Sequence, residues 1–350
     1  MIRLDDYIVQ PDSGIMDILK KIDKNNMGIV YVCDEDRKLK GAITDGDIRR
    51  FIIHSGKLDA KAVQIMKTDP ISVAESEIES AAKVMRIQQV KSVPILDENH
   101  HVVDVRFQDE RSIIVKNKIN CPVVIMAGGM GTRLQPYTSI LPKPLIPIGD
   151  KTITEHIIDR FQNAGCKHFD MIVNYKKHFI KSYFRDLERK PDIDFLEEEE
   201  FLGTAGGLRL LIGQCKESFF MTNCDILIDA DYSEIIDYHR KNGNIATIVC
   251  AVKNMKLPYG VIKTRDNGQV DSIQEKPDIT SVVNTGFYVL TPEFLDEIPE
   301  GKFVHITEVL QTCIDKGLKV GMYPVSEDNW MDMGQMDELQ KMTEKLGELR

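Results

Sequence analysis

A glycine-rich segment has the residue types needed to hold a phosphate group. It reads Met126-Ala-Gly-Gly-Met-Gly-Thr-Arg-Leu134 and follows the apolar run Val123–Met126. Glycines let backbone N–H groups approach phosphate oxygens closely, and Arg133 adds a cation beside them. A purely structural role is also open, because a Gly-Gly-x-Gly sequence can simply form a tight turn.

The residues that follow strengthen the phosphate-binding interpretation. Lys143 lies between two prolines in the sequence Leu141-Pro-Lys-Pro-Leu-Ile-Pro-Ile148. Proline fixes the backbone on both sides of this lysine, which suits an ammonium group aimed at phosphate oxygens. A structural role gives no reason for a charged residue in such a stiff, apolar setting.

These residues need a framework of buried strands to position them. Apolar runs typical of such strands alternate with amphipathic helical stretches such as Glu155–Ala164 and Ser233–His239. The runs are Val123–Met126, Met171–Val173, Ser218–Thr222 and Ile245–Val249. We therefore predict an α/β sandwich on a mostly parallel sheet, with the glycine-rich loop at the carboxyl ends of the strands. A charged helix from Met336 to Leu346 closes the chain.

The first 116 residues differ in pattern and contain an internal repeat. Each unit has a helical stretch, an apolar strand, an acidic turn and a second strand; the turns are Asp34-Glu-Asp36 and Asp97-Glu-Asn99. Such a repeat predicts two small units that cover each other's apolar faces. We place the domains at residues 1–116 and 121–350, with a charged connection between them.

Composition excludes several classes of protein. The 350 residues carry 45 Lys and Arg against 55 Asp and Glu, a net charge of −10. A main nucleic-acid partner would need a basic surface, so none is expected. No apolar run is long enough to span a membrane, and acidic residues near the start argue against a signal peptide. Seven scattered cysteines are typical of reduced thiols, so we expect a cytoplasmic protein.

Further motifs occur in order along the second half of the chain. They are Gly203-Thr-Ala-Gly-Gly-Leu208, Met221-Thr-Asn-Cys-Asp225, Glu275-Lys-Pro277, Val283-Asn-Thr-Gly-Phe287 and Trp330-Met-Asp-Met-Gly334. With the glycine-rich loop they resemble the motifs of the sugar-1-phosphate nucleotidyltransferases, from about Pro122 to beyond Asp332. One departure is Cys224, where that family usually has a glycine. The resemblance implies a Rossmann-like, GT-A-like domain of three α/β layers.

The resemblance also implies a reaction and a role for each motif. A sugar phosphate oxygen attacks the α-phosphorus of a nucleoside triphosphate, so catalysis is mostly positioning and charge neutralisation. Asp225 and Asp332 would hold Mg²⁺, which prefers oxygen ligands, while Arg133 and Lys143 would bind the phosphate chain. Nucleotide contacts are expected from Ala127, Gly128, Gly129, Gly131, Thr132, Glu198, Gly203, Thr204 and Ala205. Sugar-phosphate contacts are expected from Glu275, Lys276, Asn284, Thr285 and Asn174, with Lys276 gripping the phosphate as a catalytic residue.

The repeat at residues 1–116 resembles a tandem CBS domain, an α+β module that commonly binds adenine nucleotides. Thr44 and Asp47 match its Thr-x-x-Asp element, which implies an adenosyl site. Asp47 also opens a predicted helix, so an N-cap role would explain it equally well. The second unit lacks the threonine, so we expect one adenosyl site at most. Tandem CBS pairs often associate face to face, which makes a homo-oligomer the default expectation.

Two functional hypotheses follow. The first is an enzyme that joins a nucleotide to a sugar 1-phosphate; GTP and a mannose-like or amino sugar are favoured because the loops look most similar to guanylyltransferases. UTP, dTTP and CTP stay open. The second is a non-catalytic nucleotide sensor of the same fold. A sensor should have lost a charged phosphate ligand or a metal carboxylate, whereas this sequence keeps Arg133, Lys143, Asp225, Lys276 and Asp332.

Overall fold

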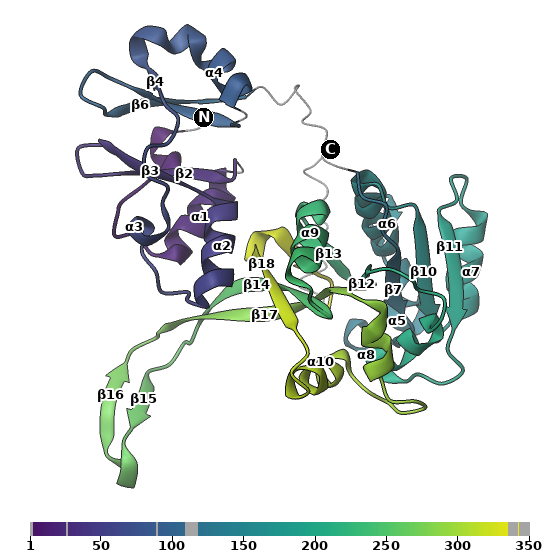
Figure 1. The fold of residues 1–350 in the computed structure, drawn as a ribbon. Helices are drawn as coiled ribbons and strands as arrows, with labels where there is room; N and C mark the ends of the chain where they lie inside the picture. Colours follow the sequence, from purple (N-terminus) through teal and green to yellow (C-terminus); the bar gives the residue numbers. More distant parts are fainter. Residues whose placement is uncertain (1–2, 26, 89, 109–117, 335–341, 343–350) are drawn as a thin grey trace. The chain divides into compact units, whose positions relative to one another are not determined.

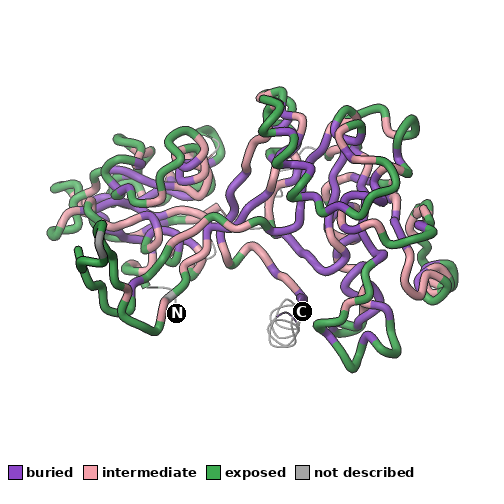
Figure 2. Tube along the Cα trace, turned by 90° about the horizontal axis from the view of Figure 1, so that it is seen from below, coloured by how far each residue is buried: buried purple, intermediate pink, exposed green. Residues whose placement is uncertain are grey.

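The computed structural model describes residues 3–25, 27–88, 90–108, 118–334 and 342 (Figure 1). Contacts along the chain divide it into two units. The first comprises Met1–Ile114 and Val252–Val282, and the second comprises Val115–Ala251 and Val283–Arg350. Figure 2 shows that the buried segments run through the interior of each unit. Apart from Met342, the helix predicted from Met336 to Leu346 lies outside the described residues.

The first unit contains the predicted repeat as two small sheets of the same design. In the first sheet, the central strand β2 pairs parallel with β1 and antiparallel with β3. In the second sheet, β5 pairs parallel with β4 and antiparallel with β6. The elements of the first copy are η1 (Leu4–Tyr7), β1 (Ile8–Val9), α1 (Ile15–Asn25), β2 (Ile29–Cys33), β3 (Leu39–Thr44), α2 (Asp45–Ser55) and α3 (Ala62–Ile65). Those of the second are β4 (Val73–Ala74), η2 (Glu75–Ser80), α4 (Ala81–Gln88), β5 (Ser92–Leu96) and β6 (Val102–Phe107).

The two copies are joined through equivalent turns. Arg37 and His100 occupy the same place in these turns, and both have left-handed backbone, with φ of 64° and 66°. The N–H of Leu39 donates to the carbonyl of His100 at 3.1 Å, and the N–H of Val102 donates to the carbonyl of Arg37 at 3.0 Å. This reciprocal exchange is what a sequence repeat predicts, because equivalent residues of the two copies make equivalent bonds.

The second unit is built on a seven-stranded sheet in the order β11–β10–β7–β12–β17–β14–β18. Strands β11, β10, β7 and β12 are parallel to one another, and β17 is antiparallel to β12. The mostly parallel sheet predicted from the apolar runs is therefore confirmed. Its strands are β7 (Val123–Ala127), β10 (His168–Val173), β11 (Asp192–Glu197), β12 (Phe219–Asn223), β14 (Ala246–Lys256), β17 (Asp278–Leu290) and β18 (Val320–Ser326).

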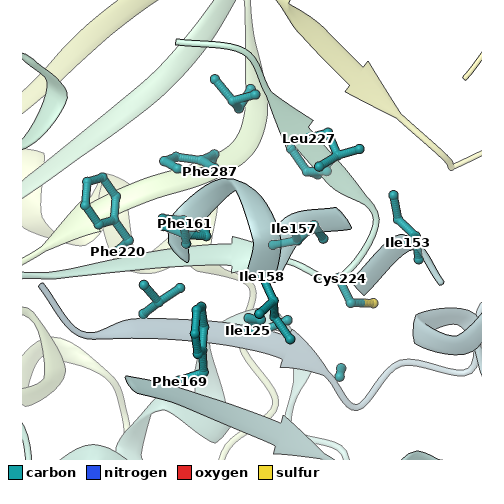
Figure 3. Close-up of a cluster of buried hydrophobic side chains, with 14 of the residues drawn as sticks. Ile125, Ile153, Ile157, Ile158, Phe161, Phe169, Phe220, Cys224, Leu227 and Phe287 are labelled. Carbon is teal, nitrogen blue, oxygen red and sulfur yellow. The ribbon is translucent and has the colours of Figure 1, made fainter. Parts of the chain in front are cut away.

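Helices cover both faces of this sheet, which gives the predicted three layers. Along β7, Val123 and Ile125 face a core formed with α6, α7 and α9, while Val124 and Met126 face a second core formed with α8, η5 and α10. In the first core, Phe161 of α6 lies among aromatic side chains of the sheet (Figure 3). The helical elements are α5 (Tyr137–Ile140), α6 (Ile153–Ala164), α7 (Lys177–Asp186), α8 (Gly203–Gly206), η5 (Gly207–Leu211), α9 (Tyr232–Asn242), η7 (Pro292–Glu297) and α10 (Ile306–Asp315).

Three two-stranded ribbons complete the fold. They are β8 (Pro147–Ile148) with β9 (Lys151–Thr152), β13 (Ile226–Ile228) with β19 (Trp330–Asp332), and β15 (Val261–Thr264) with β16 (Val270–Gln274). The last ribbon belongs to residues 252–282, which the contacts assign to the first unit although the predicted boundaries place them in the second domain. The long strands β14 and β17 run from the seven-stranded sheet into this segment. Its first and last residues therefore continue two strands of the second unit. None of the described helices is long and apolar enough to cross a membrane.

Candidate active site

The glycine-rich loop leaves the carboxyl end of β7 and enters η3 (Thr132–Leu134). Gly131 packs tightly against the segment that carries Lys143: a Cβ atom on Gly131 would lie 2.9 Å from Cγ2 of Thr138 and 3.1 Å from Cβ of Lys143. The hydroxyl of Thr138 donates to the carbonyl of Gly131 at 2.9 Å. The loop and the Pro-Lys-Pro segment therefore form one packed structure, and a side chain at position 131 would separate them.

Lys143 lies in η4 (Lys143–Leu145) and forms a buried ion pair with Asp225. Its Nζ atom donates to Oδ2 of Asp225, and the two side chains are only 13% and 9% exposed. Burial alone would lower the pKa of Lys143, but the carboxylates of Asp225 and Asp332 outweigh it and hold that pKa above its ordinary value. Lys143 therefore stays protonated, with its ammonium group directly against the carboxyl group of Asp225.

The pairing of β13 with β19 brings Asp332 close to Asp225. Ile226, next to Asp225 in the chain, pairs directly with Asp332, and the N–H of Met333 donates to the carbonyl of Asp225 at 3.0 Å. Burial and the negative charge of Asp225 raise the pKa of Asp332, while the cations of Lys143 and Arg133 partly oppose this rise. Repulsion between the two carboxyl groups therefore contributes to the raised pKa of Asp332, and the nearby ammonium group of Lys143 opposes it only in part.

The donor set at this point fits a divalent metal ion. Asp225 and Asp332 provide carboxylate oxygens, which hard cations prefer. Because burial and the charge of Asp225 raise the pKa of Asp332, a cation bound between the two carboxyl groups would favour the ionised form of Asp332. Asp225 and Asp332 are the residues that would hold such an ion.

Another cluster of side chains that could bind a metal ion lies elsewhere in the second unit. His168, Asp170 and Asp194 bring ligand atoms within 4.8 Å of one another among the described residues. They lie at the amino ends of β10 and β11, whereas the glycine-rich loop follows the carboxyl end of β7. The nitrogens of His168 already contact the neighbouring carboxylates, with Nδ1 3.2 Å from Asp192. The imidazole of His168 therefore links the carboxyl groups of β10 and β11.

Glu198 is a buried carboxyl group without a partner for one of its oxygens. It follows β11 and is 4% exposed, and its Oε2 atom has no hydrogen-bond partner among the described residues. The carboxyl lies against the backbone of Gly128, where an added Cβ would be 2.6 Å from Oε2. Burial raises the pKa of Glu198 to about 7. An unpaired buried acceptor is costly, so a donor from a bound molecule would stabilise it.

The Gly-Thr-Ala-Gly segment is fixed by backbone contacts with residues 304–306. The N–H of Val304 donates to the carbonyl of Leu202 at 3.0 Å, and the N–H of Ala205 donates to the carbonyl of Val304 at 3.2 Å. Gly203 has φ of 85°, and a Cβ there would lie 2.4 Å from the oxygen of Val304. The hydroxyl of Thr204 accepts from the N–H of Ile306 at 3.0 Å. A glycine is required here because two chain segments meet backbone to backbone.

These segments enclose one cavity of about 240 Å³. Ten of the predicted residues line it: Gly128, Gly129, Gly131, Thr132, Arg133, Lys143, Glu198, Gly203, Thr204 and Asp225. Ala127 and Ala205 are buried beside it. The other lining residues, for which no binding role is predicted from the sequence, are Met126, Leu134, Phe201, Asn223, Cys224 and Gly334. Met126, Leu134 and Cys224 directly neighbour a predicted residue in the chain, and this adjacency was their signal; the other three had no such signal.

Three predicted sugar-contacting residues of this unit have partners within the protein. Asn174 donates to the carbonyl of Glu198 at 3.1 Å and so helps to position that residue. Asn284 donates to the hydroxyl of Tyr288 at 2.7 Å, and the buried hydroxyl of Thr285 donates to the carbonyl of Val249 at 2.6 Å. None of the three lines the described cavity. Their contact with a sugar stays a prediction.

Glu275 and Lys276 lie in the segment assigned to the first unit. Both side chains are exposed, at 72% and 57%, and their charged atoms are 4.0 Å apart. Their roles toward the sugar phosphate stay predictions.

Thr44 and Asp47 form a capping box at the start of α2. The N–H of Thr44 donates to Oδ2 of Asp47 at 2.9 Å, and the N–H of Asp47 donates to the hydroxyl of Thr44 at 3.2 Å. Burial raises the pKa of Asp47, but hydrogen bonds from Thr44 and ion pairs with Arg50 and Lys67 outweigh it and leave that pKa below its ordinary value. The N-cap is thus Thr44, and Asp47 completes the capping box from the third helical position, so the N-cap role predicted for Asp47 itself is wrong. The adenosyl site stays a prediction.

Comparison with known proteins agrees with both halves of this description. Residues 122–348 match the Nucleotidyl transferase model, and residues 2–54 match the CBS domain model. A UTP–glucose-1-phosphate uridylyltransferase from Synechocystis sp. is 33% identical over 234 residues, which cover 61% of this chain and 60% of that protein. A mannose-1-phosphate guanyltransferase from Aspergillus oryzae is 32% identical over 221 residues, with 61% and 60% covered. The chain thus spans about 60% of the length of these curated relatives.

A solved structure gives the same result for the fold. The crystal structure of HddC from Yersinia pseudotuberculosis matches with a TM-score of 0.51 and 25% identity, over 65% of this chain and 99% of that one. A UDP-glucose pyrophosphorylase complexed with UDP-glucose shares the fold at 19% identity, with a TM-score of 0.51. The chain carries a CBS domain at its amino end and belongs to the nucleotidyl transferase family.

Proposed function

We propose that this chain transfers a nucleotidyl group from a nucleoside triphosphate, with GTP favoured, to a sugar 1-phosphate, releasing pyrophosphate. The observation that carries the proposal is the convergence of a glycine-rich loop, Arg133, Lys143 and Asp225 on one cavity. Two cations and a backbone loop suit a triphosphate, because the reaction brings together two anions and needs their charge neutralised. A mannose-like or amino sugar is the proposed acceptor.

Each charged side chain has a distinct task in this reaction. Arg133 holds the departing pyrophosphate, and Lys143 binds the phosphate chain beside it. A divalent cation held by Asp225 and Asp332, with Mg²⁺ proposed, would neutralise charge on the phosphate oxygens. Lys276 grips the incoming sugar phosphate. No general base is needed, since the attacking phosphate is already ionised near neutral pH.

Glu198 favours GTP among the four common triphosphates. Its ionised carboxylate can only accept hydrogen bonds. Guanine presents a ring N–H and an exocyclic NH₂ side by side, so it can donate to both carboxylate oxygens, whereas uracil and thymine present one ring N–H. The unpartnered Oε2 in the cavity wall suits the base with more adjacent donors. UTP, dTTP and CTP are the alternatives, since the relatives include a uridylyltransferase as well as guanyltransferases.

The other functional class is a nucleotide sensor without catalysis. Arg133, Lys143 and Asp225 line the cavity, and Asp332 adjoins it through Asp225. A sensor has no need for this full set, which is why the enzyme is preferred. An adenine nucleotide at the CBS domain and a homo-oligomer are further proposals.

A pyrophosphate-release assay tests these alternatives. The full chain is incubated with Mg²⁺, each of GTP, UTP, dTTP and CTP, and a panel of sugar 1-phosphates, with and without AMP or ATP. We expect release with GTP and a mannose-like or amino sugar. Release with UTP and not with GTP would show that the preference for GTP is wrong, while the proposed reaction would stand. No release in any combination, together with measurable GMP binding, would favour the sensor.

A further inference from the structure

Two exposed phenylalanine rings meet beside the cavity. Phe201 is 39% exposed and lines the cavity, and Phe303 is 56% exposed. Their ring centroids are 5.9 Å apart in a T-shaped arrangement, and Phe303 makes a second T-shaped contact with His305 at 5.0 Å. Exposed apolar rings are unfavourable in water, and single ones are common, but this pair forms a continuous aromatic surface.

The backbone holds the two rings in place. Phe201 precedes the loop of Leu202 and Gly203, and Phe303 precedes Val304, whose N–H donates to the carbonyl of Leu202 at 3.0 Å. The close approach at Gly203 fixes the same two segments against each other. The spacing of the rings is therefore set by hydrogen-bonded backbone rather than by the side chains alone. A surface that is ordered before binding loses little entropy when a flat molecule packs on it.

We propose that Phe201 stacks on the face of the nucleobase and favours a purine over a pyrimidine, with Phe303 as the residue that positions its ring. This inference rests on the proposed function. Among the described residues that line the cavity, Phe201 is the one aromatic side chain, and Glu198 lies in the same wall. Glu198 can accept hydrogen bonds from the edge of a base, whereas the ring of Phe201 can pack against the face of the base. A purine offers two fused rings to that face, so it gains more from stacking than a pyrimidine does.

Calorimetry with GMP and UMP as probes tests the proposal on the full chain. For Phe201→Leu we expect GMP to bind about 10-fold more weakly, the loss that follows removal of one base–aromatic contact, and UMP to lose less. Phe303→Leu should weaken GMP by about 3-fold, in line with one edge-to-face ring contact. Phe201→Tyr keeps the ring and should bind GMP as the unchanged protein does. Phe179→Leu removes an exposed ring outside the cavity lining and should have no effect.

The possible results separate this inference from the proposed function. If the unchanged protein binds neither GMP nor UMP, the proposed nucleotide site is wrong and the stacking role with it. If it binds GMP and Phe201→Leu binds GMP equally well, stacking is wrong and the proposed function stands. If Phe201→Leu weakens UMP as much as GMP, the purine preference is wrong. Far-ultraviolet circular dichroism and denaturation of each variant show whether a loss of binding reflects a loss of folding.

Discussion

Lys143 and Asp225, 82 positions apart in the sequence, form an ion pair that is buried at the carboxyl end of the central sheet. Lys143 comes from a rigid Pro-Lys-Pro segment, and Asp225 follows the end of β12. Burying two charges is costly, and the pair stays favourable only while both partners are present. Lys143 therefore neutralises Asp225 in the absence of other cations, and it would bind phosphate oxygens in the presence of a triphosphate.

The first prediction concerns this pair. Lys143→Met removes the ion-pair partner of the buried Asp225, so we expect the free energy of unfolding to fall by about 3 kcal/mol, as it does when one partner of a buried pair is removed. Millimolar Mn²⁺ should restore more stability to this variant than to the unchanged protein, because the freed carboxylates can bind the metal. Urea denaturation with and without Mn²⁺, and the electron paramagnetic resonance of bound Mn²⁺, measure both effects.

The control is the double variant Lys143→Met with Asp225→Asn, which removes the uncompensated charge. It should be more stable than Lys143→Met alone and should lose the response to Mn²⁺. Equal instability of the single and double variants would mean that the ion pair is not what stabilises this region.

The second prediction concerns Arg133, which lines the cavity beside the glycine-rich loop. Arg133→Ala should lower kcat by about 100-fold or more, equivalent to about 3 kcal/mol, the usual loss for a preorganised charge donor. Steady-state kinetics with the substrates found in the pyrophosphate-release assay measure this. Arg189→Ala, at an exposed site outside the cavity lining, is the matched control. A change within a factor of a few for Arg133→Ala would exclude its role at the departing pyrophosphate.

The third prediction concerns the pH dependence caused by Glu198. Its pKa rises from the ordinary 4.5 to about 7 in the folded chain, so the folded state holds one more proton than the unfolded state between these values. The free energy of unfolding should therefore fall as pH rises through this window, by about 3 kcal/mol between pH 5 and pH 8. Glu198→Gln should remove most of this slope, which denaturation at several pH values measures.

The same variant tests recognition of the base. GMP should bind the unchanged protein more tightly at pH 8 than at pH 6, because the ionised carboxylate accepts from guanine. Glu198→Gln should bind GMP weakly at both pH values. The neighbouring exposed Glu199→Gln serves as the control and should keep the pH dependence of the unchanged protein. An unaltered pH profile in Glu198→Gln would show that another group controls it.

The fourth prediction compares two glycines with similar backbone. Gly203 and Gly213 have φ of 85° and 79°, but only at Gly203 would an added Cβ meet another atom, the carbonyl oxygen of Val304 at 2.4 Å. Gly213→Ala should cost about 1 kcal/mol for the left-handed backbone. Gly203→Ala should cost about 3 kcal/mol, because the backbone of residues 202–205 and 304 must also separate. Urea denaturation measures both, and equal losses would mean that the two segments can move apart freely.

Much of this protein can be predicted from its sequence. The continuous apolar run of β7 predicts a strand buried on both faces, and the repeat before residue 116 predicts two copies of one small unit. The glycine-rich loop and Lys143 are phosphate-binding candidates because their residue types and local spacing suit that chemistry, whereas Asp225 is a metal-ligand candidate through the resemblance to the nucleotidyltransferase motifs. Local pattern is sufficient for these features, because strand periodicity and loop composition depend on neighbouring residues.

Other features depend on contacts between distant parts of the chain. The pairing of β13 with β19 brings Asp332 beside Asp225, and the packing of Gly131 against Lys143 closes the loop onto the ion pair. Phe201 has no periodic pattern around it, and its role follows only from the ring of Phe303 and from the cavity that Phe201 lines. The sequence alone therefore determined which chemical groups are available and which elements carry them. Only the tertiary structure decided which of these groups meet, because burial, shifted pKa values and cavity shape arise from packing between segments far apart in the chain.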